Sequence, residues 1–283
     1  MSVSAKETTV NSEGGDQILH ENTLYAEPVF HVGNWPITNS MINSWLVVLI
    51  VLVLAWSLKG KIKSVPRGLQ NGLEMIFEAF FDIFDSVTGS RKKTLQFAPF
   101  VLAFFFFVLL NNWMGLLPGV GSIGQIVAED GHKLFIPYFR GATADLNTTL
   151  ALATLAVVAS HIMGVLAIGW WKYLNKFVNF KILLEIPKKV IKDPTILLVN
   201  PIKFFVGLIE VVGELAKVAS LSFRLFGNIF AGEVLLASMS AILAFGLPLP
   251  FMFLEVIVGL IQALIFSILV LIYLSIATTA EEH

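Results

Sequence analysis

Two long apolar stretches of this chain, 201–246 and 251–279, contain side chains that can carry charge or exchange protons. An ionisable group at the middle of a bilayer costs from ~3 kcal/mol on insertion scales to more than ~10 kcal/mol in simulations. Such groups therefore indicate a function rather than simple packing. The charged residues of the two stretches are Lys203, Glu210, Glu214, Lys217, Arg224, Glu233 and Glu255.

Arg224 and two of the carboxylates suggest a chemistry. Arg224 has apolar turns on both sides, and no acidic residue lies within one turn of it. A guanidinium, with a pKa above ~12, keeps its charge and releases no proton. Glu233 and Glu255, in contrast, can take up and release protons. Together these groups suit a proton path with two water-accessible halves and a fixed charge between them.

A helical projection places small and amide side chains beside Arg224. At about 100° per residue, Glu233 points to roughly the opposite side of the helix. In the next stretch, Glu255 and Gln262 are seven residues apart and share a face. A helical hairpin could bring Gln262 near Arg224 and Glu255 near Glu233. Small residues let a neighbouring helix approach closely. The residues on the Arg224 side are Gly227, Asn228, Ala231 and Gly232.

The other charged residues of the first stretch allow a second interpretation. Lys203 and Lys217 could extend their ammonium groups to a membrane interface. Glu210, Glu214 and Lys217 could simply form ion pairs one helical turn apart near the inner surface. Neither interpretation is favoured over participation in a proton path.

The elements that must hold these side chains are membrane-spanning helices, each of which needs about 20 apolar residues to cross roughly 30 Å of hydrocarbon. The predicted fold class is an all-α polytopic membrane protein with about five crossing helices. Near 66–88, apolar residues recur at helical spacing and predict an amphipathic helix at the interface. We predict a polar external segment over 1–40 and a single membrane domain over 41–283. The predicted spans are 42–58, 97–117, 150–171, 201–246 and 251–279.

The last two predicted helices are longer than a membrane is thick. At 1.5 Å per residue, 201–246 would extend to roughly 69 Å and 251–279 to roughly 43 Å. Because both lengths exceed the hydrocarbon thickness, these helices must tilt steeply, break, or lie partly along the membrane. A steeply tilted helical hairpin is the favoured prediction.

Composition excludes several classes of protein. With 56% hydrophobic and 14% charged residues, the chain lies outside the ordinary soluble class. The absence of cysteine excludes a disulfide scaffold, a thiol enzyme and a Cys-ligated metal site. His20, His31 and His132 lack the spacing of metal ligands, so no metal and no cofactor is predicted. A net charge of −1 argues against nucleic acid as a partner.

The distribution of basic residues predicts the orientation. Thirteen of the 19 lysines and arginines lie in 59–93 and 172–192. The positive-inside rule places these two segments in the cytoplasm. An odd number of crossings then puts the N-terminus outside and the C-terminus in the cytoplasm.

The charged residues are concentrated in the last third of the chain, which favours a proton path that a partner protein completes. Two other classes of membrane protein are alternatives to this interpretation. A self-contained cation/proton antiporter or channel would also use intramembrane carboxylates, but it is expected to show repeated halves and broken helices. A membrane-embedded enzyme would need a metal cluster or a nucleophile–base pair, and neither pattern is present in the sequence.

Several motifs resemble subunit a of the bacterial F-type ATP synthase. The most specific is the run Ser222-Phe-Arg-Leu-Phe-Gly-Asn-Ile-Phe-Ala-Gly-Glu233. The pattern Gln262-Ala-Leu-Ile-Phe, followed by Tyr273-Leu-Ser-Ile-Ala, is similar to the last helix of that family. Asp145-Leu-Asn-Thr-Thr and Phe97-Ala-Pro-Phe are also similar. The resemblance extends over most of the chain from about residue 40 onward.

This resemblance implies a non-catalytic stator subunit of the F0 proton channel. Arg224 would face the carboxylates of the rotating c-ring. Two aqueous half-channels would be lined or bordered by Asn228, Glu233, Glu255 and Gln262, and the packing positions would be Gly227, Ala231 and Gly232. The implied partners are the c-ring, subunit b, the F1 head through the stator, and membrane lipid. The implied location is the bacterial inner membrane.

Two further residues have weaker assignments. Asp145 could lie at the mouth of the external channel, but aspartate before a helix is commonly an N-cap, and the cap is the favoured interpretation. His161 matches no site implied by the resemblance, and a packed or water-bonded histidine is expected there.

Overall fold

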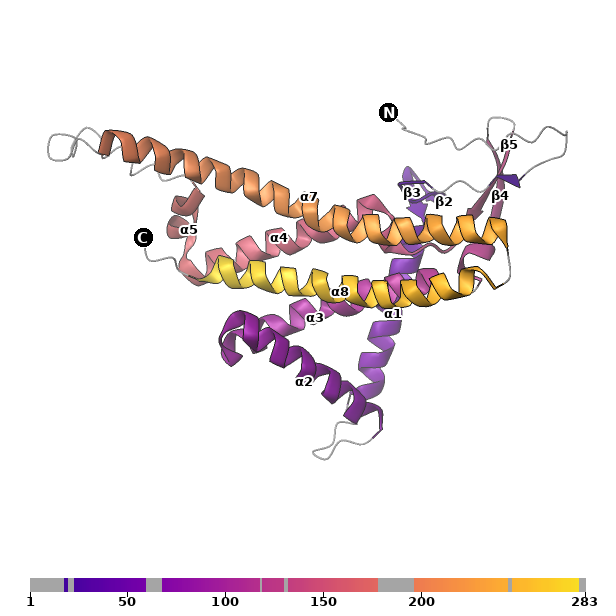
Figure 1. Ribbon diagram of the computed structural model, residues 1–283, viewed down its shortest axis with the longest axis horizontal. Coiled ribbons are helices and arrows are strands. Elements are labelled where there is room, and N and C mark those ends of the chain that lie inside the picture. The colour runs from indigo at the N-terminus through magenta and orange to yellow at the C-terminus, as the bar shows by residue number, and fades with distance from the viewer. Residues whose placement is uncertain are drawn as a thin grey trace. The chain divides into compact units, whose positions relative to one another are not determined.

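A computed structural model describes residues 18–19, 23–59, 68–117, 119–129, 132–177, 196–243 and 246–279. Within these ranges, five helices are long and apolar enough to cross a membrane (Figure 1). The predicted fold class, an all-α polytopic membrane protein, is thereby confirmed. The five helices are α1 (Asn39–Leu58), α3 (Arg91–Leu116), α4 (Leu146–Ile168), α7 (Ile196–Ile242) and α8 (Pro248–Thr278).

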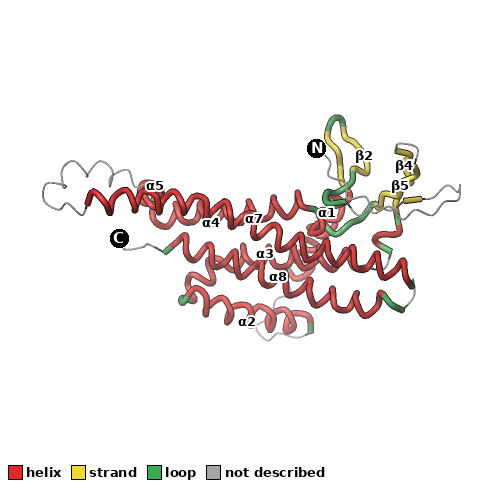
Figure 2. Tube along the Cα trace, turned by 45° about the horizontal axis from the view of Figure 1, so that its top comes forward, coloured by secondary structure: helices red, strands yellow, loops and turns green. Residues whose placement is uncertain are grey.

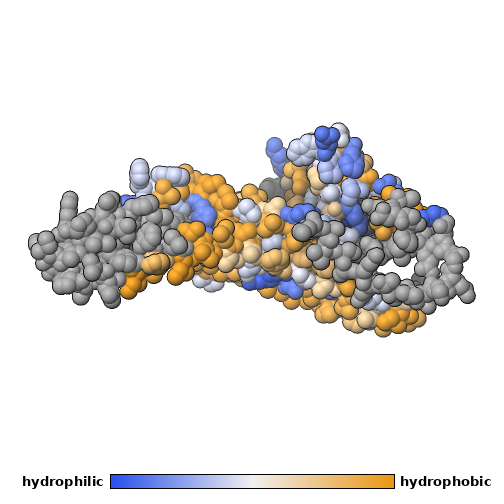
Figure 3. All heavy atoms as spheres, turned by 90° about the horizontal axis from the view of Figure 1, so that it is seen from above, coloured by the Kyte–Doolittle hydropathy of each residue, from blue (hydrophilic) through white to orange (hydrophobic). Residues whose placement is uncertain are grey.

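Apolar side chains cover much of the surface of these helices. Figure 3 shows them in orange over most of the described surface in view. On α1, Leu52 and Trp56 are 61% and 79% exposed, and on α7, Ile209 and Leu215 are both 68% exposed. Water-soluble monomers rarely expose apolar patches of this extent. These helix faces therefore require lipid as their solvent.

The amphipathic helix predicted near 66–88 is α2 (Leu69–Thr88). Phe80 and Phe84 on its apolar side are buried, whereas Glu78 and Asp82 on the other side are exposed. The helix ends at Gly89, whose φ of 65° is left-handed and whose N–H donates to the Asp85 carbonyl. A glycine adopts this conformation without the steric cost that a side chain would bring.

The third predicted span differs from the structure at its end. The prediction continued through Trp171, but α4 stops at Ile168 and a separate short helix, α5 (Trp170–Phe177), follows. Gly169 separates the two helices with a φ of 93°. The left-handed backbone of this glycine ends α4. The apolar pattern gives no sign of this end, because the tryptophans that follow are apolar although they belong to α5.

Two small sheets occupy the segments before α1 and between α3 and α4 (Figure 2). The antiparallel hairpin of β2 (Pro28–Val32) and β3 (Trp35–Thr38) leads directly into α1. The other sheet pairs β5 (His132–Pro137) antiparallel with β4 (Gly124–Glu129) and parallel with β1 (Ile18–Leu19). The short helices η1 (Val120–Ser122) and η2 (Ala142–Ala144) flank β4 and β5. The sequence did not indicate these strands.

The last two helices have the length that the sequence predicted. α7 contains 47 residues and α8 contains 31 residues. α7 begins at Ile196 rather than near Pro201, and it ends at Ile242 rather than near 246. The turn between the two helices includes Gly246, at a φ of 97°. The steep tilt of this hairpin stays a prediction.

The chain divides into two compact units. The first comprises Met1–Val65, Phe105–Thr149 and Arg224–Leu264. Two asparagines of α3 hold its helices together. Asn111 Oδ1 accepts from Asn43 Nδ2 on α1 at 3.1 Å, and Asn112 Nδ2 donates to the Gly259 carbonyl on α8 at 2.8 Å. These asparagines interrupt an apolar run because they bond to neighbouring helices.

The second unit comprises Pro66–Phe104, Leu150–Phe223 and Ile265–His283. Its core includes an aromatic contact between Phe104 and Phe266, whose ring centroids are 5.6 Å apart. Gly164 of α4 lies against Tyr173 and the Ala277 carbonyl, so a larger residue would not fit there. Most of the predicted inner loop 172–192, and the C-terminal residues 280–283, lie outside the described residues.

Candidate functional site

Arg224 lies on an exposed side of α7. Its neighbours on the opposite side, Leu225, Phe226 and Ile229, are only 1%, 8% and 9% exposed. The exposed side is called the Arg224 face below. Its members are Arg224, Gly227, Asn228 and Ala231.

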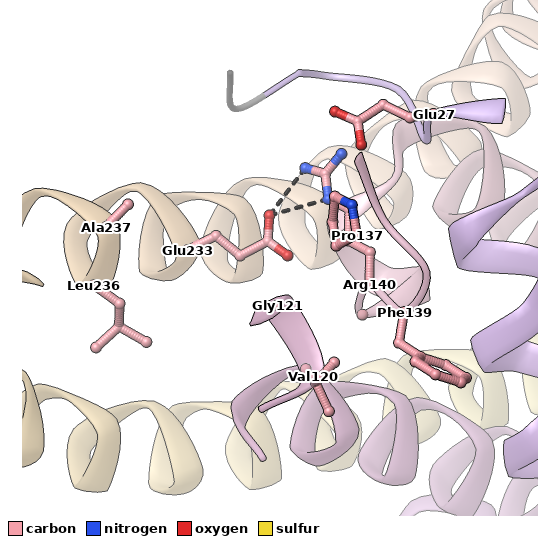
Figure 4. Close-up of a pocket in the computed structure, with 11 residues that line it drawn as sticks. Glu27, Val120, Gly121, Pro137, Phe139, Arg140, Glu233, Leu236 and Ala237 are labelled. Atoms are coloured by element: carbon pink, nitrogen blue, oxygen red, sulfur yellow. Dashed lines mark hydrogen bonds and ion pairs between the residues drawn. The ribbon is translucent and has the colours of Figure 1, made fainter. Parts of the chain in front are cut away.

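Glu233 lies elsewhere on α7 and pairs with an arginine that the sequence did not single out. Its Oε2 accepts hydrogen bonds from Arg140, at 2.9 Å from Nη2 and 3.2 Å from Nε (Figure 4). Arg140 is in the connection between β5 and η2, and its side chain is 9% exposed. The guanidinium is thus a buried partner of the carboxylate, and such charge-assisted bonds are stronger than neutral ones.

The remaining donors of Arg140 bind the segment before β2. Its Nη1 donates to Thr23 Oγ1 and to the Tyr25 carbonyl, each at 3.2 Å, and Nη2 donates to the Thr23 carbonyl at 2.9 Å. One guanidinium therefore joins this segment to α7 and fixes where the Glu233 carboxylate lies.

A cavity of about 180 Å³ lies beside this ion pair. Glu27, Arg140 and Glu233 contribute its charged lining, and Val120 of η1 lines it from the segment after α3 (Figure 4). A water molecule occupies about 30 Å³ in the liquid, so the cavity has room for several. Most of its lining is apolar, but its three charged side chains can each bind water there.

A second cavity of about 30 Å³ connects the two glutamates of the last helices. Glu233 of α7, Glu255 of α8 and Asn112 of α3 all line it. Glu233 thus borders both cavities, while Arg224 lines neither of them. The last two helices thus bring Glu233 and Glu255 to one cavity, as expected for a helical hairpin.

Glu255 fits against a glycine of the neighbouring helix. It is 8% exposed, and its carboxyl group occupies the space where a side chain at Gly232 would begin. Gly232 is buried on α7 and faces α8 rather than the Arg224 face. Gln262 is half-buried on α8, seven residues after Glu255.

Asp145 is held by four donors. Its carboxylate accepts from Asn147 N at 3.1 Å and Thr148 Oγ1 at 2.8 Å, in the first turn of α4. It also accepts from Ser40 Oγ at 3.1 Å and Ala26 N at 3.3 Å. Asp145 lines neither cavity, so its geometry supports the helix-capping interpretation.

Sequence reasoning missed Arg140, Asn112 and Glu27. Arg140 lies with Lys133 between the predicted spans 97–117 and 150–171, outside the apolar stretches, where an arginine is common. Its significance depends on a partner 93 residues away. Among the described residues, no cluster of three or more His, Asp or Glu side chains could hold a metal ion.

Comparison with known proteins gives consistent matches over most of the chain. Residues 41–275 match the family model described as ATP synthase A chain. ATP synthase subunit a of Legionella pneumophila is 27% identical over 265 residues, which are 93% of this chain and 96% of the relative. ATP synthase subunit a of Geotalea uraniireducens is 32% identical over 240 residues, or 85% and 87% of the two chains. The same subunit of Moorella thermoacetica is 29% identical over 247 residues.

Proposed function

Because this chain belongs to the ATP synthase A chain family, we propose that it is the stator subunit of the F0 proton channel. In this function it passes protons to and from the carboxylates of the c-ring through two aqueous half-channels. The observation that supports this proposal most strongly is that Glu233 borders two adjoining cavities, the second of which reaches Glu255. The same helix presents Arg224 on an exposed face.

The larger cavity serves as the outer half-channel. Protons enter it as hydrated species and reach Glu233, whose carboxylate Arg140 holds in place. From Glu233 they pass across the smaller cavity to Glu255, and from there to a carboxylate of the c-ring. Asn228 and Gln262 offer amide groups that orient water along this path. Each group is polar, so together they reduce the cost of carrying a proton through hydrocarbon.

Arg224 acts as the barrier between the half-channels. Its guanidinium attracts a c-ring carboxylate and favours the release of that carboxylate's proton, but cannot itself carry one. Gly227 and Ala231 on the Arg224 face add little bulk, so the c-ring helix can approach closely. The chain performs no covalent chemistry. Each charge that crosses yields about 2.3 kcal/mol per 100 mV of membrane potential, so several crossings are coupled to one ATP.

The orientation follows the basic residues. We place the N-terminus and both small sheets outside, and the C-terminus in the cytoplasm, in the inner membrane of a bacterial cell. The larger cavity, which lies beside the segment before β2, then opens to the outside. Subunit b and the F1 head are the further partners in the complex.

Reconstitution with and without the c-ring tests this function. The chain alone in proteoliposomes is expected to carry little directed proton current, and the matching c-ring should raise that current at least about tenfold, because the ring supplies the missing carboxylates. The measurement is acidification of the vesicle lumen under an imposed potential. Full current from the chain alone would favour the alternative, a self-contained cation/proton antiporter or channel.

Gly232→Ala is expected to move the Glu255 carboxyl group without unfolding the chain. The added methyl group would overlap that carboxyl group, which is the end of a flexible side chain and can swing away. Proton-driven ATP synthesis should fall about tenfold, because proton transfer to Glu255 slows when its carboxyl group is displaced. Gly213→Ala is the matched control, since no atom lies within 4 Å of its added carbon. If both variants lose the same activity, the Glu255 carboxyl is not the cause.

A further inference from the structure

A second group of titratable side chains lies in the other compact unit, and none of them lines either cavity. Four helices contribute to it: α4 provides His161, α5 provides Tyr173, α7 provides Glu214 and Lys217, and α8 provides Tyr273. The group is called the His161 cluster below. Nothing in the path from Glu233 to Glu255 uses it.

His161 lies between a phenol and a carboxylate. Its Nδ1 is 2.6 Å from the Tyr173 hydroxyl oxygen, within hydrogen-bond distance. Its Nε2 is 3.6 Å from Glu214 Oε2. In a neutral imidazole one nitrogen carries a hydrogen and the other accepts. A second proton would therefore give an imidazolium that donates to Tyr173 and faces the carboxylate of Glu214.

Lys217 occupies the other oxygen of Glu214. Its Nζ donates to Glu214 Oε1 at 2.6 Å and lies 5.3 Å from the centre of the Tyr273 ring. The sequence left open whether this lysine reaches an interface or pairs along the helix, and the geometry is that of an i,i+3 ion pair. One carboxylate oxygen of Glu214 thus contacts Lys217, and the other faces His161.

Tyr173 stays neutral and acts as a partner of the ring. Burial, followed by the nearby carboxylates Glu214 and Glu210, raises the pKa of its phenol to about 12. At physiological pH the phenol therefore keeps its proton. The imidazole of His161 is left as the group of the cluster that exchanges a proton near neutral pH.

The cluster and Glu233 lie on opposite sides of Arg224 along α7. Glu214 precedes Arg224 by ten residues, and Glu233 follows it by nine residues. α5 also follows α4 at the end that leads into the basic segment 172–192, which the positive-inside rule assigns to the cytoplasm. The fixed charge is thus flanked along one helix by a titratable group on each side.

We propose that the His161 cluster is the proton-exchange site of the inner half-channel, with His161 as the group that carries the proton. This inference rests on the proposed function, because it names the residues of the second half of that path. A proton that leaves the c-ring carboxylate arrives through water as hydronium. An N–H bond forms on the imidazole as an O–H bond of hydronium breaks. Loss of that proton to cytoplasmic water restores the neutral ring.

Glu214 sets the pH at which this exchange occurs. Its carboxylate stabilises the imidazolium, and Lys217 at the same carboxylate opposes it. The charged or titratable groups that the described interactions place in or beside the cluster are Tyr173, Glu210, Glu214, Lys217 and Tyr273. An unperturbed imidazole titrates near pH ~6.5, which is close to cytoplasmic pH and suits a group that both accepts and releases protons.

The test is the dependence of proton pumping on inner pH in the assembled enzyme. Inverted membrane vesicles expose the inner side to the medium, and pumping is divided by ATP hydrolysis in the same vesicles. Glu214→Gln is expected to move the midpoint of the inner-pH profile about one pH unit lower, because the imidazolium loses its counter-charge and stays beside Lys217. His161→Gln should remove that midpoint and reduce pumping about tenfold.

Matched controls separate this effect from general damage. His31→Gln removes a histidine on the exposed face of β2, and Asp85→Asn removes the carboxylate of an exposed ion pair with Arg91. Both variants should keep the original profile. A native-like profile in both His161→Gln and Glu214→Gln would overturn the inference. A uniform loss of activity at every pH, with no change in midpoint, would also overturn it and assign the cluster to packing.

Accessibility provides a second readout that does not depend on activity. The chain has no cysteine, so Glu214→Cys introduces a single thiol. A membrane-impermeant thiol reagent should label it from the inner side at least about tenfold faster than from the outer side. Labelling only from the outer side would overturn the inner location. If Arg224 proves dispensable, the proposed function fails. If Arg224 is essential but the cluster variants behave as wild type, only this inference fails.

Discussion

Replacing Arg224 with alanine is expected to abolish ATP synthesis by the assembled enzyme while ATP hydrolysis by the F1 head continues. Without the guanidinium, no fixed charge draws a c-ring carboxylate into place or separates the two half-channels. We expect proton-driven synthesis to fall at least about a hundredfold, because an intramembrane charge has no substitute in an apolar helix. The measurement is ATP synthesis driven by an imposed proton gradient in vesicles, beside hydrolysis by detached F1.

Two variants make this result interpretable. Arg91→Ala removes another arginine, one that is 51% exposed and pairs with Asp85. It should change synthesis little, since exposed pairs contribute roughly 0–1 kcal/mol. Arg224→Lys keeps the charge but loses the planar donors, so it reports how much of the effect is charge alone. Normal synthesis in Arg224→Ala would refute the mechanism proposed for the Arg224 face.

Replacing Arg140 with alanine is expected to have the next largest effect. The change removes the partner of Glu233 and also the donors that hold Thr23 and Tyr25. Removing one partner of a fully buried ion pair costs about 3–5 kcal/mol, and this pair, in which Glu233 is 27% exposed, should cost less. The Glu233 carboxylate should then move or remain protonated, and proton uptake from the outer side should fall about a hundredfold. The measurement is ATP synthesis as a function of outer pH.

A double-mutant cycle distinguishes positioning of Glu233 from a role in folding. Glu233→Gln has no carboxylate to hold, so adding Arg140→Ala to it should cost much less than Arg140→Ala costs alone. Arg140→Lys should recover part of the activity and shift the outer-pH profile. If the two changes add fully, and every variant keeps the wild-type outer-pH profile, then Arg140 does not position Glu233.

The apolar pattern determined most of the fold. The five long helices and the amphipathic α2 were predictable because hydrophobic periodicity is a local property of the sequence. The end of α4 was not, because Gly169 breaks the helix through its backbone conformation while the apolar run continues. The strands before α1 and after α3 were also not predicted. The pairing of β1 with β5 could not be, since it joins segments that are distant in the chain.

The sequence by itself determined which residues would be costly in a membrane: Arg224, Glu233 and Glu255 are conspicuous because charge is expensive in hydrocarbon. Only the tertiary structure decided their partners. Arg140 meets Glu233 across 93 residues, and His161 meets Glu214 from another helix. The local sequence shows that a charged side chain lies in an apolar stretch and is therefore costly. Which oppositely charged side chain pairs with it depends on which distant segments pack together. That packing decides which carboxylate borders both cavities and which one faces His161.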